Sequence, residues 1–453
     1  MKTDLNASSQ TKKRGRLLRV LGVGFGLAVI IGNTIGAGIF RAPGEIAGQL
    51  PNQWLFLAVW VVGGLYALLG AFQIAELGTM LPRSGGQYVF SRYALGEYAG
   101  FIVGWSDWIS TCGSAAAVSI VIGDFAGRLF PVLAGKTTAI AATVAIVFAV
   151  LQWQGIVLSS VVQALTSFLK ALAFILLVIA AFVFADTQGF TGAAPAAITP
   201  ARLALFGAFI IALQSVIYTY DGWAGVVYFS EEVRNPARDI PRSLFSGVLA
   251  IIGIYLLVNF ALLHVLPISK IGGEEFAAGE AAKIIFGRYG GRVFLVLTIL
   301  SMLSAINAYH LMATRVIFSM GRDRLLAEGV ARVNEGGTPT VALFLSASMA
   351  VLIILFGKTF GKVITVLAFF FVANYTLSFI SVFVLRRREP EKERPYRAWG
   401  YPWTTALALL GSIAFLGGAV ASDTRNSVYA LLLLAASYPA FLLTKMLIRG
   451  SPL

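Results

Sequence analysis

Twelve apolar runs, each long enough to cross a lipid bilayer, follow one another along this chain. A transmembrane helix needs about 20 predominantly apolar residues, and the bilayer interior offers no water to satisfy backbone groups. The runs are continuous rather than alternating, which favours helices over the strands of a β-barrel. The sequence therefore predicts an all-α polytopic membrane protein of about twelve transmembrane helices. The runs fall at approximately 18–46, 54–80, 97–126, 137–153, 157–185, 203–229, 243–267, 292–320, 339–357, 361–385, 403–421 and 427–447.

The composition excludes several other classes of protein. Of the 453 residues, 58% are hydrophobic and only 12% are charged, whereas a soluble domain carries about 25% charge. A soluble enzyme, a disordered protein and a disulfide-stapled secreted domain are thereby excluded. The two histidines, His264 and His310, lie far apart, and Cys112 is the single cysteine. Because neither a metal cluster nor a Cys/His pair can be assembled from these, we expect no metal, no cofactor and no enzyme activity.

The net charge of +14 could indicate a nucleic-acid partner, so the placement of the basic residues decides its meaning. Loops on the same side as the N-terminus hold about twice as many lysines and arginines as loops on the other side. Cytoplasmic loops of membrane proteins carry such an excess. We therefore expect both termini in the cytoplasm and no nucleic-acid partner. The first apolar run is too long for a signal peptide and shows no clear cleavage site, so it is treated as the first span.

The first and sixth runs are both interrupted at membrane depth. The first contains Gly32, Gly36 and Gly38 around the polar pair Asn33–Thr34, and the sixth contains the turn signal Asp221–Gly222. For the first run, an alternative interpretation is a helix-packing face formed by Gly32 and Gly36. Interruptions in corresponding positions of two groups of five spans indicate an inverted-repeat transporter with its binding site at the midplane.

Such interruptions suit a zwitterionic ligand. Free N–H groups at the start of a restarted half-helix attract a carboxylate, and free carbonyls at the end of the preceding half accept hydrogen bonds from an ammonium group. An amino acid carries both charges at a fixed spacing. Asp221 has two candidate roles, as the cap of a restarted half-helix or as a contact to the substrate.

Lys170 lies in the fifth run, ~20 Å from either end of that helix. A lysine side chain cannot reach water over that distance, so it must face protein or an aqueous cavity. Two roles remain open: a buried lysine bound to helix-end carbonyls, or a charge that takes part in coupling near the broken helices.

Several other polar residues inside the runs are weaker candidates. Asn307 and Asn374 could face the substrate side chain, although asparagine in a span is about as often a link between helices. Glu76, Asp107 and Asp124 are expected to pair with loop or span arginines such as Arg315. The adjacent acids Glu231 and Glu232 are expected to pair with the arginine-rich 234–242 loop.

The chain resembles the amino acid permeases of the amino acid–polyamine–organocation superfamily, and within it the bacterial members of the L-type amino acid transporter branch. The resemblance covers nearly the whole chain, and the order of its motifs is specific. The motifs are Gly36-Ala-Gly-Ile-Phe40, Ala75-Glu-Leu-Gly78 with Pro82-Arg-Ser-Gly-Gly86, Lys170, Tyr220-Asp-Gly-Trp223, Ser230-Glu-Glu-Val-Arg-Asn-Pro236, Asp239-Ile-Pro-Arg242, Arg315 to Asp323, and Arg394 to Pro402.

The resemblance implies a LeuT-type five-plus-five inverted repeat with discontinuous helices 1 and 6, followed by two extra helices. The implied organisation is a cytoplasmic tail over 1–17, a first repeat over 18–185, a second over 203–385, a basic cytoplasmic loop over 386–402, helices 11 and 12 over 403–447, and a tail over 448–453.

The resemblance also implies the contacts to the substrate. Its carboxylate would meet the N–H groups of Gly36, Ala37, Gly38 and Ile39, and its amino group the carbonyls of Thr34, Tyr218 and Asp221. Tyr218 matches an aromatic gate, Lys170 matches a lysine that replaces a sodium site, and Asn374 matches a pocket-lining asparagine. With the flanking residues, the predicted substrate site comprises Thr34, Ile35, Gly36, Ala37, Gly38, Ile39, Tyr218, Thr219, Tyr220, Asp221, Gly222 and Asn374.

Two departures limit what the resemblance implies. Ala224 stands where L-type relatives often have asparagine, so the side-chain preference cannot be transferred. Animal relatives use a loop cysteine to bind a heavy chain, whereas Cys112 lies within a span, so no disulfide-linked partner is expected; a homodimer stays open.

The resulting expectation is sodium-independent transport of L-amino acids, neutral ones above all, across the plasma membrane (in a bacterium, the inner membrane) by alternating access. Exchange, proton symport and uniport all fit the sequence. The alternatives are a transporter of cationic amino acids or polyamines, and a membrane sensor or channel that binds an amino acid without carrying it.

Overall fold

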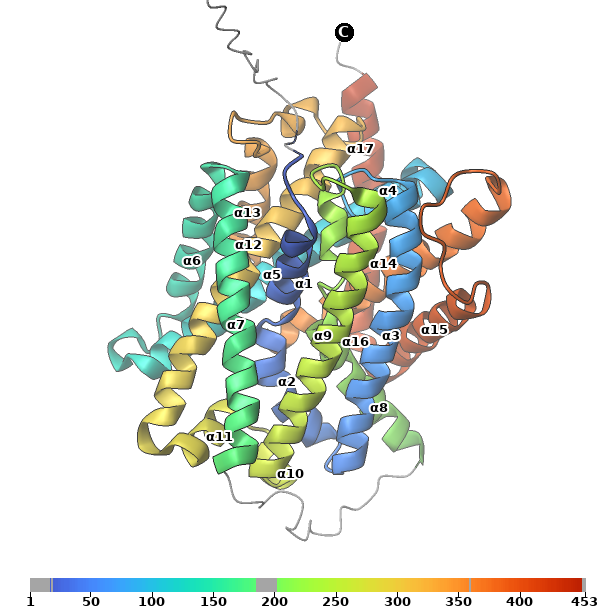
Figure 1. Ribbon diagram of the computed structural model, residues 1–453. Coiled ribbons are helices and arrows are strands. Elements are labelled where there is room, and N and C mark those ends of the chain that lie inside the picture. The colour runs from blue at the N-terminus through green and yellow to red at the C-terminus, as the bar shows by residue number, and fades with distance from the viewer. Residues whose placement is uncertain (1–16, 18, 185–201, 358–359, 450–453) are drawn as a thin grey trace, which may run out of the picture.

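The computed structural model describes residue 17 and residues 19–184, 202–357 and 360–449, all in helices and connecting turns apart from two isolated bridges. Figure 1 shows the long helices running side by side. The predicted tails over 1–17 and 448–453 lie almost wholly outside the described residues. The first five spans are α1 (Val23–Thr34) with α2 (Ala37–Gln49), α3 (Gln53–Met80), α5 (Glu97–Leu129), α6 (Thr137–Trp153) and α7 (Ile156–Phe184).

Five more spans follow α7 along the chain, and two further spans come after those five. The short helices α4 (Gln87–Leu95), α10 (Ile268–Ile271) and α11 (Ala277–Phe286) lie between spans. The remaining spans are α8 (Arg202–Tyr220) with the 3-10 segment η2 (Gly225–Phe229), α9 (Pro236–Val265), α12 (Gly290–Arg322), α13 (Thr340–Gly357), α14 (Phe360–Arg388), α15 (Trp403–Ser422), and α16 (Thr424–Ala435) with α17 (Ser437–Arg449).

The number of spans agrees with the sequence. Among the described residues, eleven helical segments are long and apolar enough to cross a membrane. α6, with 17 residues, is a twelfth apolar helix at the lower limit of spanning length. The turn between the fourth and fifth spans lies at Gln154–Gly155, where Gly155 adopts φ +137°. That conformation is open to glycine but strained for other residues.

The first broken span lies at the centre of the molecule. In Figure 1, α1 and α2 are stacked end to end behind α9 and α7. α1 packs against α7, α9 and α12, while α8 packs against α2, α3 and α14. The two interrupted spans are therefore surrounded by other helices, and their interruptions are shielded from lipid, as a break at membrane depth requires.

Both ends of the described chain lie at one end of the molecule. Figure 1 shows the start of α1, the short helix α4, the turn after α12 and the end of α17 together at the top of the view, and α10 and α11 at the bottom. The loops at the top include those that the sequence marks as basic.

At that same end, two ion pairs hold the residues after η2 to α12. Arg315 donates from Nε and Nη2 to the two carboxylate oxygens of Glu232, both at 3.0 Å, and both side chains are fully buried. Arg322 donates to Glu231 at 2.6 Å. The prediction that these acids pair with the 234–242 loop is therefore wrong, because two arginines on α12 point at them instead.

The buried pair gives a test of this packing. Removing one partner of a buried ion pair leaves an uncompensated charge, which costs about 3–5 kcal/mol. We expect Arg315→Met to lower the free energy of unfolding by about that amount and to lower the thermal midpoint in detergent. The control is Arg128→Met, because Arg128 pairs with Glu275 in an exposed position and such pairs contribute at most about 1 kcal/mol. Equal shifts in the two variants would contradict a stabilising role of the buried contact.

Candidate substrate-binding site

The first interruption lies between α1 and α2. Helix α1 ends at Thr34, Ile35 and Gly36 are not helical, and α2 starts at Ala37. The first N–H groups of a helix have no partner within it, and none of the N–H groups of Ala37, Gly38 and Ile39 has a backbone partner among the described residues. These three groups lie at the positive end of the α2 dipole, in a position that suits an anion.

The second interruption lies after α8. The helix ends at Tyr220, Asp221 to Ala224 form turns, and the chain continues as the 3-10 segment η2. Gly222 has φ +103°, which explains why the sequence places glycine directly after Asp221. η2 starts at Gly225 without a side-chain cap. The candidate role of Asp221 as a cap of a restarted half-helix is therefore wrong.

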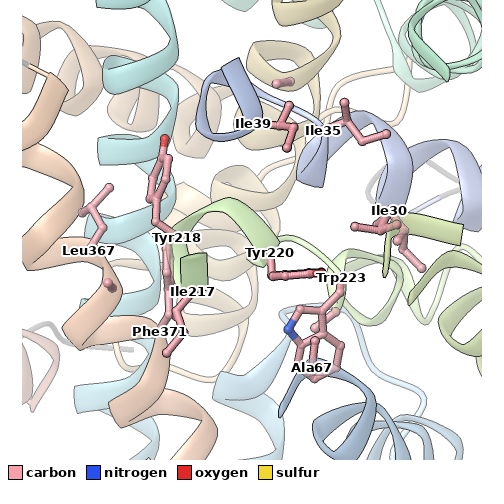
Figure 2. Close-up of a cluster of buried hydrophobic side chains, with 14 of the residues drawn as sticks. Ile30, Ile35, Ile39, Ala67, Ile217, Tyr218, Tyr220, Trp223, Leu367 and Phe371 are labelled. Atoms are coloured by element: carbon pink, nitrogen blue, oxygen red, sulfur yellow. The ribbon is translucent and has the colours of Figure 1, made fainter. Parts of the chain in front are cut away.

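The two interruptions touch each other. A β-carbon at position 38 would lie 2.5 Å from Thr219 Oγ1, and one at position 222 would clash with the Asn33 amide. Figure 2 shows Ile35 and Ile39, beside the first interruption, in the same buried cluster as four residues at the second: Ile217, Tyr218, Tyr220 and Trp223. Glycines at 38 and 222 therefore let the two backbones approach, and the structure brings together the residues that the sequence predicts to line the site.

The alternative interpretation, a helix-packing face formed by Gly32 and Gly36, holds for Gly32 but not for Gly36. A β-carbon at Gly32 would collide with the side chains of Gln163 and Ser167 on α7, whereas one at Gly36 would make only ordinary contacts, at 3.6 Å or more. Gly32 is thus required for helix packing, while Gly36 belongs to the interruption itself.

The carbonyl groups that end α1 are held by long side chains from neighbouring helices. Lys170 Nζ on α7 donates to the Gly32 carbonyl at 2.8 Å, and Tyr309 on α12 donates to the Asn33 carbonyl at 3.4 Å. Lys170 is 1% exposed, which confirms that it faces protein. A positive charge at the C-terminal end of a helix is stabilised by the helix dipole.

Tyr255 on α9 links the two interruptions. Its hydroxyl lies 2.6 Å from the Thr34 carbonyl and 2.9 Å from the Thr219 carbonyl. Since a hydroxyl has one hydrogen, it donates to one of these carbonyls at a time. None of the sequence motifs singles out Tyr255. The available signal was a tyrosine in mid-span, where a buried hydroxyl needs a partner.

Tyr218 and Asn374 are both buried beside the second interruption. The Tyr218 ring packs edge-on against Phe360 and its hydroxyl has no hydrogen-bond partner among the described residues. Asn374 Oδ1 accepts a hydrogen bond from Ser106 at 2.7 Å, and its Nδ2 has no partner within the described part of the chain. Each residue therefore keeps a polar group available.

The carboxylate of Asp221 accepts a hydrogen bond from Tyr375 on α14 at 2.8 Å. Asn307, in contrast, donates to Gln163 at 2.9 Å and to the Ser159 carbonyl at 3.1 Å, and accepts from Gln152. It therefore links α12 to α6 and α7 and is not a candidate for contacting the substrate.

The expected pairing with an arginine is confirmed for Glu76 and Asp124 and is wrong for Asp107. Glu76 pairs with Arg386 at 2.6 Å and Asp124 with Arg41 at 2.6 Å. Asp107 is different. Both its carboxyl oxygens lie within hydrogen-bond distance of the Tyr228 hydroxyl, and Arg315 is bound to Glu232.

Comparison with known proteins decides the family. Residues 26–437 match a family model described as amino acid permease. The chain belongs to the amino acid permease family. This match confirms the resemblance deduced from the sequence motifs. Members of this family are transporters and not enzymes.

Three relatives illustrate the similarity of this permease to transporters. The serine/threonine exchanger SteT of Bacillus subtilis is 30% identical over 432 residues, which cover 94% of this chain and 96% of SteT. The Asc-type amino acid transporter 1 of Mus musculus is 27% identical over 85% of this chain and 74% of its own. The human b(0,+)-type amino acid transporter 1 is 26% identical over 86% of this chain and 80% of its own.

The close approach at Gly38 generates a prediction. In Gly38→Ala the new methyl group would collide with Thr219, so we expect the two interruptions to separate and amino acid uptake into proteoliposomes to fall at least tenfold. Gly417→Ala is the matched control, because a β-carbon there meets open space, and it should leave uptake unchanged. Uptake by Gly38→Ala at the wild-type rate would show that the contact is not needed for transport.

Proposed function

We propose that this permease carries neutral L-amino acids across the plasma membrane by alternating access. The observation that carries the proposal is the contact between the two interruptions. It brings the N–H groups of Ala37 to Ile39, which have no backbone partner among the described residues, beside the carbonyl end of α8. A zwitterion fits between a positive and a negative helix end, and paired broken helices at the midplane are the feature of inverted-repeat transporters.

In this proposal the substrate carboxylate binds the N–H groups at the start of α2. The ammonium group binds carbonyls at the second interruption, those of Tyr218 and Asp221, together with that of Thr34. Tyr255 leaves room for this, because its hydroxyl can donate to Thr219 when the substrate occupies Thr34. Tyr218 covers the substrate, and Asn374 Nδ2 lines the space for its side chain.

A neutral side chain is the best fit. Asp221 lies at the second interruption, and Tyr375 already donates to its carboxylate. The name of the bacterial relative points to serine and threonine, and both carry a hydroxyl that Asn374 could bind. We therefore propose serine and threonine as the first substrates to examine, with exchange as the first mode of transport.

The orientation is proposed from charge. The end of the molecule that holds the start of α1 and the end of α17 also holds the most basic loops (Figure 1). By the positive-inside rule this end faces the cytoplasm.

The direct test is counterflow into proteoliposomes. Vesicles containing purified permease and loaded with unlabelled serine are placed in labelled serine, and saturable accumulation of label is expected. A panel of the twenty amino acids and of polyamines as competitors should show inhibition by small neutral amino acids and none by arginine or putrescine. Absence of counterflow with all twenty amino acids would contradict the proposal. Competition by arginine or putrescine would instead favour the alternative, a transporter of cationic amino acids or polyamines. Current without saturation would favour a channel.

We further propose that Lys170 takes the place of a sodium ion beside α1, since its Nζ already donates to the Gly32 carbonyl. Replacing sodium with choline should then leave serine counterflow unchanged, whereas Lys170→Ala should reduce it at least tenfold by freeing the end of α1. Lys136→Ala, an exposed lysine directly before α6, serves as a charge-matched control. Loss of counterflow in choline would contradict the proposed role of the lysine.

A further inference from the structure

A cavity of about 1220 Å³ lies at the end of the molecule that holds the end of α17 (Figure 1). Its walls come from α5, α12, α13 and α17, and the turn after α12 closes it together with the 3-10 segment η4 (Glu328–Ala331). The described residues that line it include none of those predicted for the substrate site. Pockets for small ligands measure about 300–1,000 Å³, so this cavity has room for a molecule much larger than an amino acid.

The interior of the cavity is apolar. Trp105 and Trp108 of α5 line it, and each indole N–H is bound to a residue that does not line it. Trp105 donates to the Leu433 carbonyl at 3.1 Å, and Trp108 donates to the Ser346 hydroxyl at 2.9 Å. The lining residues of α12 and α13 are apolar as well. The cavity therefore presents ring and hydrocarbon surface, which holds no ordered water.

On the side of α17 the cavity meets a surface that faces lipid. Leu447, which lines the cavity, is 71% exposed, and the adjacent Met446 is 67% exposed. The last span, formed by α16 and α17, has the least buried apolar window of the candidate spans, at 11%. The molecules that can reach an apolar opening between spans are those of the bilayer itself.

The rim of the cavity carries two opposite charges. Arg324, in the turn after α12, and Glu328, at the start of η4, both line the cavity, with side chains 67% and 75% exposed. Arg324 Nε lies 3.4 Å from Glu328 Oε1, and exposed pairs of this kind contribute little. Neither residue forms another ion pair within the described part of the chain. The terminal nitrogens of Arg324 and the second oxygen of Glu328 are thus open to a ligand.

The backbone of Arg324 is unusual. Its φ is +57°, and among the described residues it is the one non-glycine residue with a positive φ. That region disfavours residues with a side chain, and such conformations cluster at functional positions. The chain thus keeps an arginine where glycine would be relaxed, which indicates that the guanidinium group at the rim has a function.

We propose that the cavity binds one glycerophospholipid with a zwitterionic headgroup that carries an ammonium group, as phosphatidylethanolamine does. One acyl chain lies along Trp105 and Trp108. The phosphate binds the Arg324 guanidinium, whose planar fork suits phosphate oxygens, and the ammonium group binds Glu328. The rim is neutral overall, so a lipid with a phosphate and no cation leaves Glu328 beside a like charge.

This lipid site is separate from amino acid binding. The bound lipid bridges α17 to α5 and to the turn after α12. In the orientation proposed above, the cavity opens in the cytoplasmic leaflet. The site adds a membrane ligand to the proposed transport function and does not depend on which amino acid is carried.

The test is native mass spectrometry of the full-length permease, purified in detergent, stripped of lipid and titrated with phosphatidylethanolamine. We expect one tightly held lipid per wild-type chain. Phosphatidylglycerol and diacylglycerol with the same acyl chains should bind at least about tenfold more weakly, because each lacks one or both charged contacts.

Three variants examine the rim. Arg324→Gly removes the guanidinium and relaxes the backbone, so lipid affinity should fall at least about tenfold while the thermal midpoint without lipid does not fall. Glu328→Gln should remove the preference for phosphatidylethanolamine over phosphatidylglycerol. Arg332→Ala is the matched control, because Arg332 is exposed directly after η4 and does not line the cavity, and it should bind lipid as the wild type does.

A further variant examines the apolar part of the cavity and keeps the test decisive if Arg324→Gly fails to fold. Leu345 lines the cavity from α13 and is 45% exposed, so Leu345→Trp can fill the space without disturbing the core. We expect this variant to bind phosphatidylethanolamine at least about tenfold more weakly, since the acyl chain loses its place.

Four outcomes would overturn the inference. They are diacylglycerol binding as tightly as phosphatidylethanolamine, unchanged lipid affinity in Arg324→Gly or in Leu345→Trp, a lower thermal midpoint of lipid-free Arg324→Gly, and dimers of the stripped wild type that exclude lipid. The last would show that a second copy covers the cavity. Serine counterflow is measured separately, so failure of lipid binding leaves the transport proposal standing.

Discussion

Backbone polar groups inside a bilayer must find a partner, and the architecture of this permease depends on that constraint. Two spans are interrupted, so helix ends that would normally meet water lie within the protein. On the carbonyl side of the first interruption, Lys170, Tyr255 and Tyr309 supply donors to Gly32, Thr34 and Asn33. On the amide side, the described chain supplies no backbone acceptor for Ala37 to Ile39. In the binding mode that we propose, the carboxylate of an amino acid completes this set.

The partners of the buried polar groups fall into two kinds with different consequences. Toward the end that holds the start of α1 and the end of α17, arginines bind acids through two hydrogen bonds, as in Arg315–Glu232 and Arg386–Glu76. Near the interruptions, tyrosine hydroxyls take this role. A bidentate ion pair is costly to break once buried, whereas a hydroxyl rotates between acceptors. The ion pairs thus hold the packing of span six against α12, while the tyrosines allow rearrangement around the substrate.

Much of this arrangement could be predicted from the sequence, because its causes are local. The length of each apolar run sets the number of spans, and glycines beside polar residues mark both interruptions. Lys170 could be placed in the protein interior from its distance to either helix end. What could not be predicted is which side chains face one another across helices. The pairing of Arg315 with Glu232 rather than Asp107, and the reach of Tyr255 to both interruptions, depend on helix rotation, which hydropathy does not determine.

The central claim is that an amino acid is held between the two interruptions by backbone groups. A cryo-EM structure of the permease with bound serine tests this directly. The account predicts the serine carboxylate at hydrogen-bond distance, about 3 Å, from the amide nitrogens of Ala37 to Ile39, with its ammonium beside the carbonyls of Tyr218 and Asp221. Serine bound elsewhere, or held by its carboxylate to a side chain while these amides stay unpaired, would contradict it.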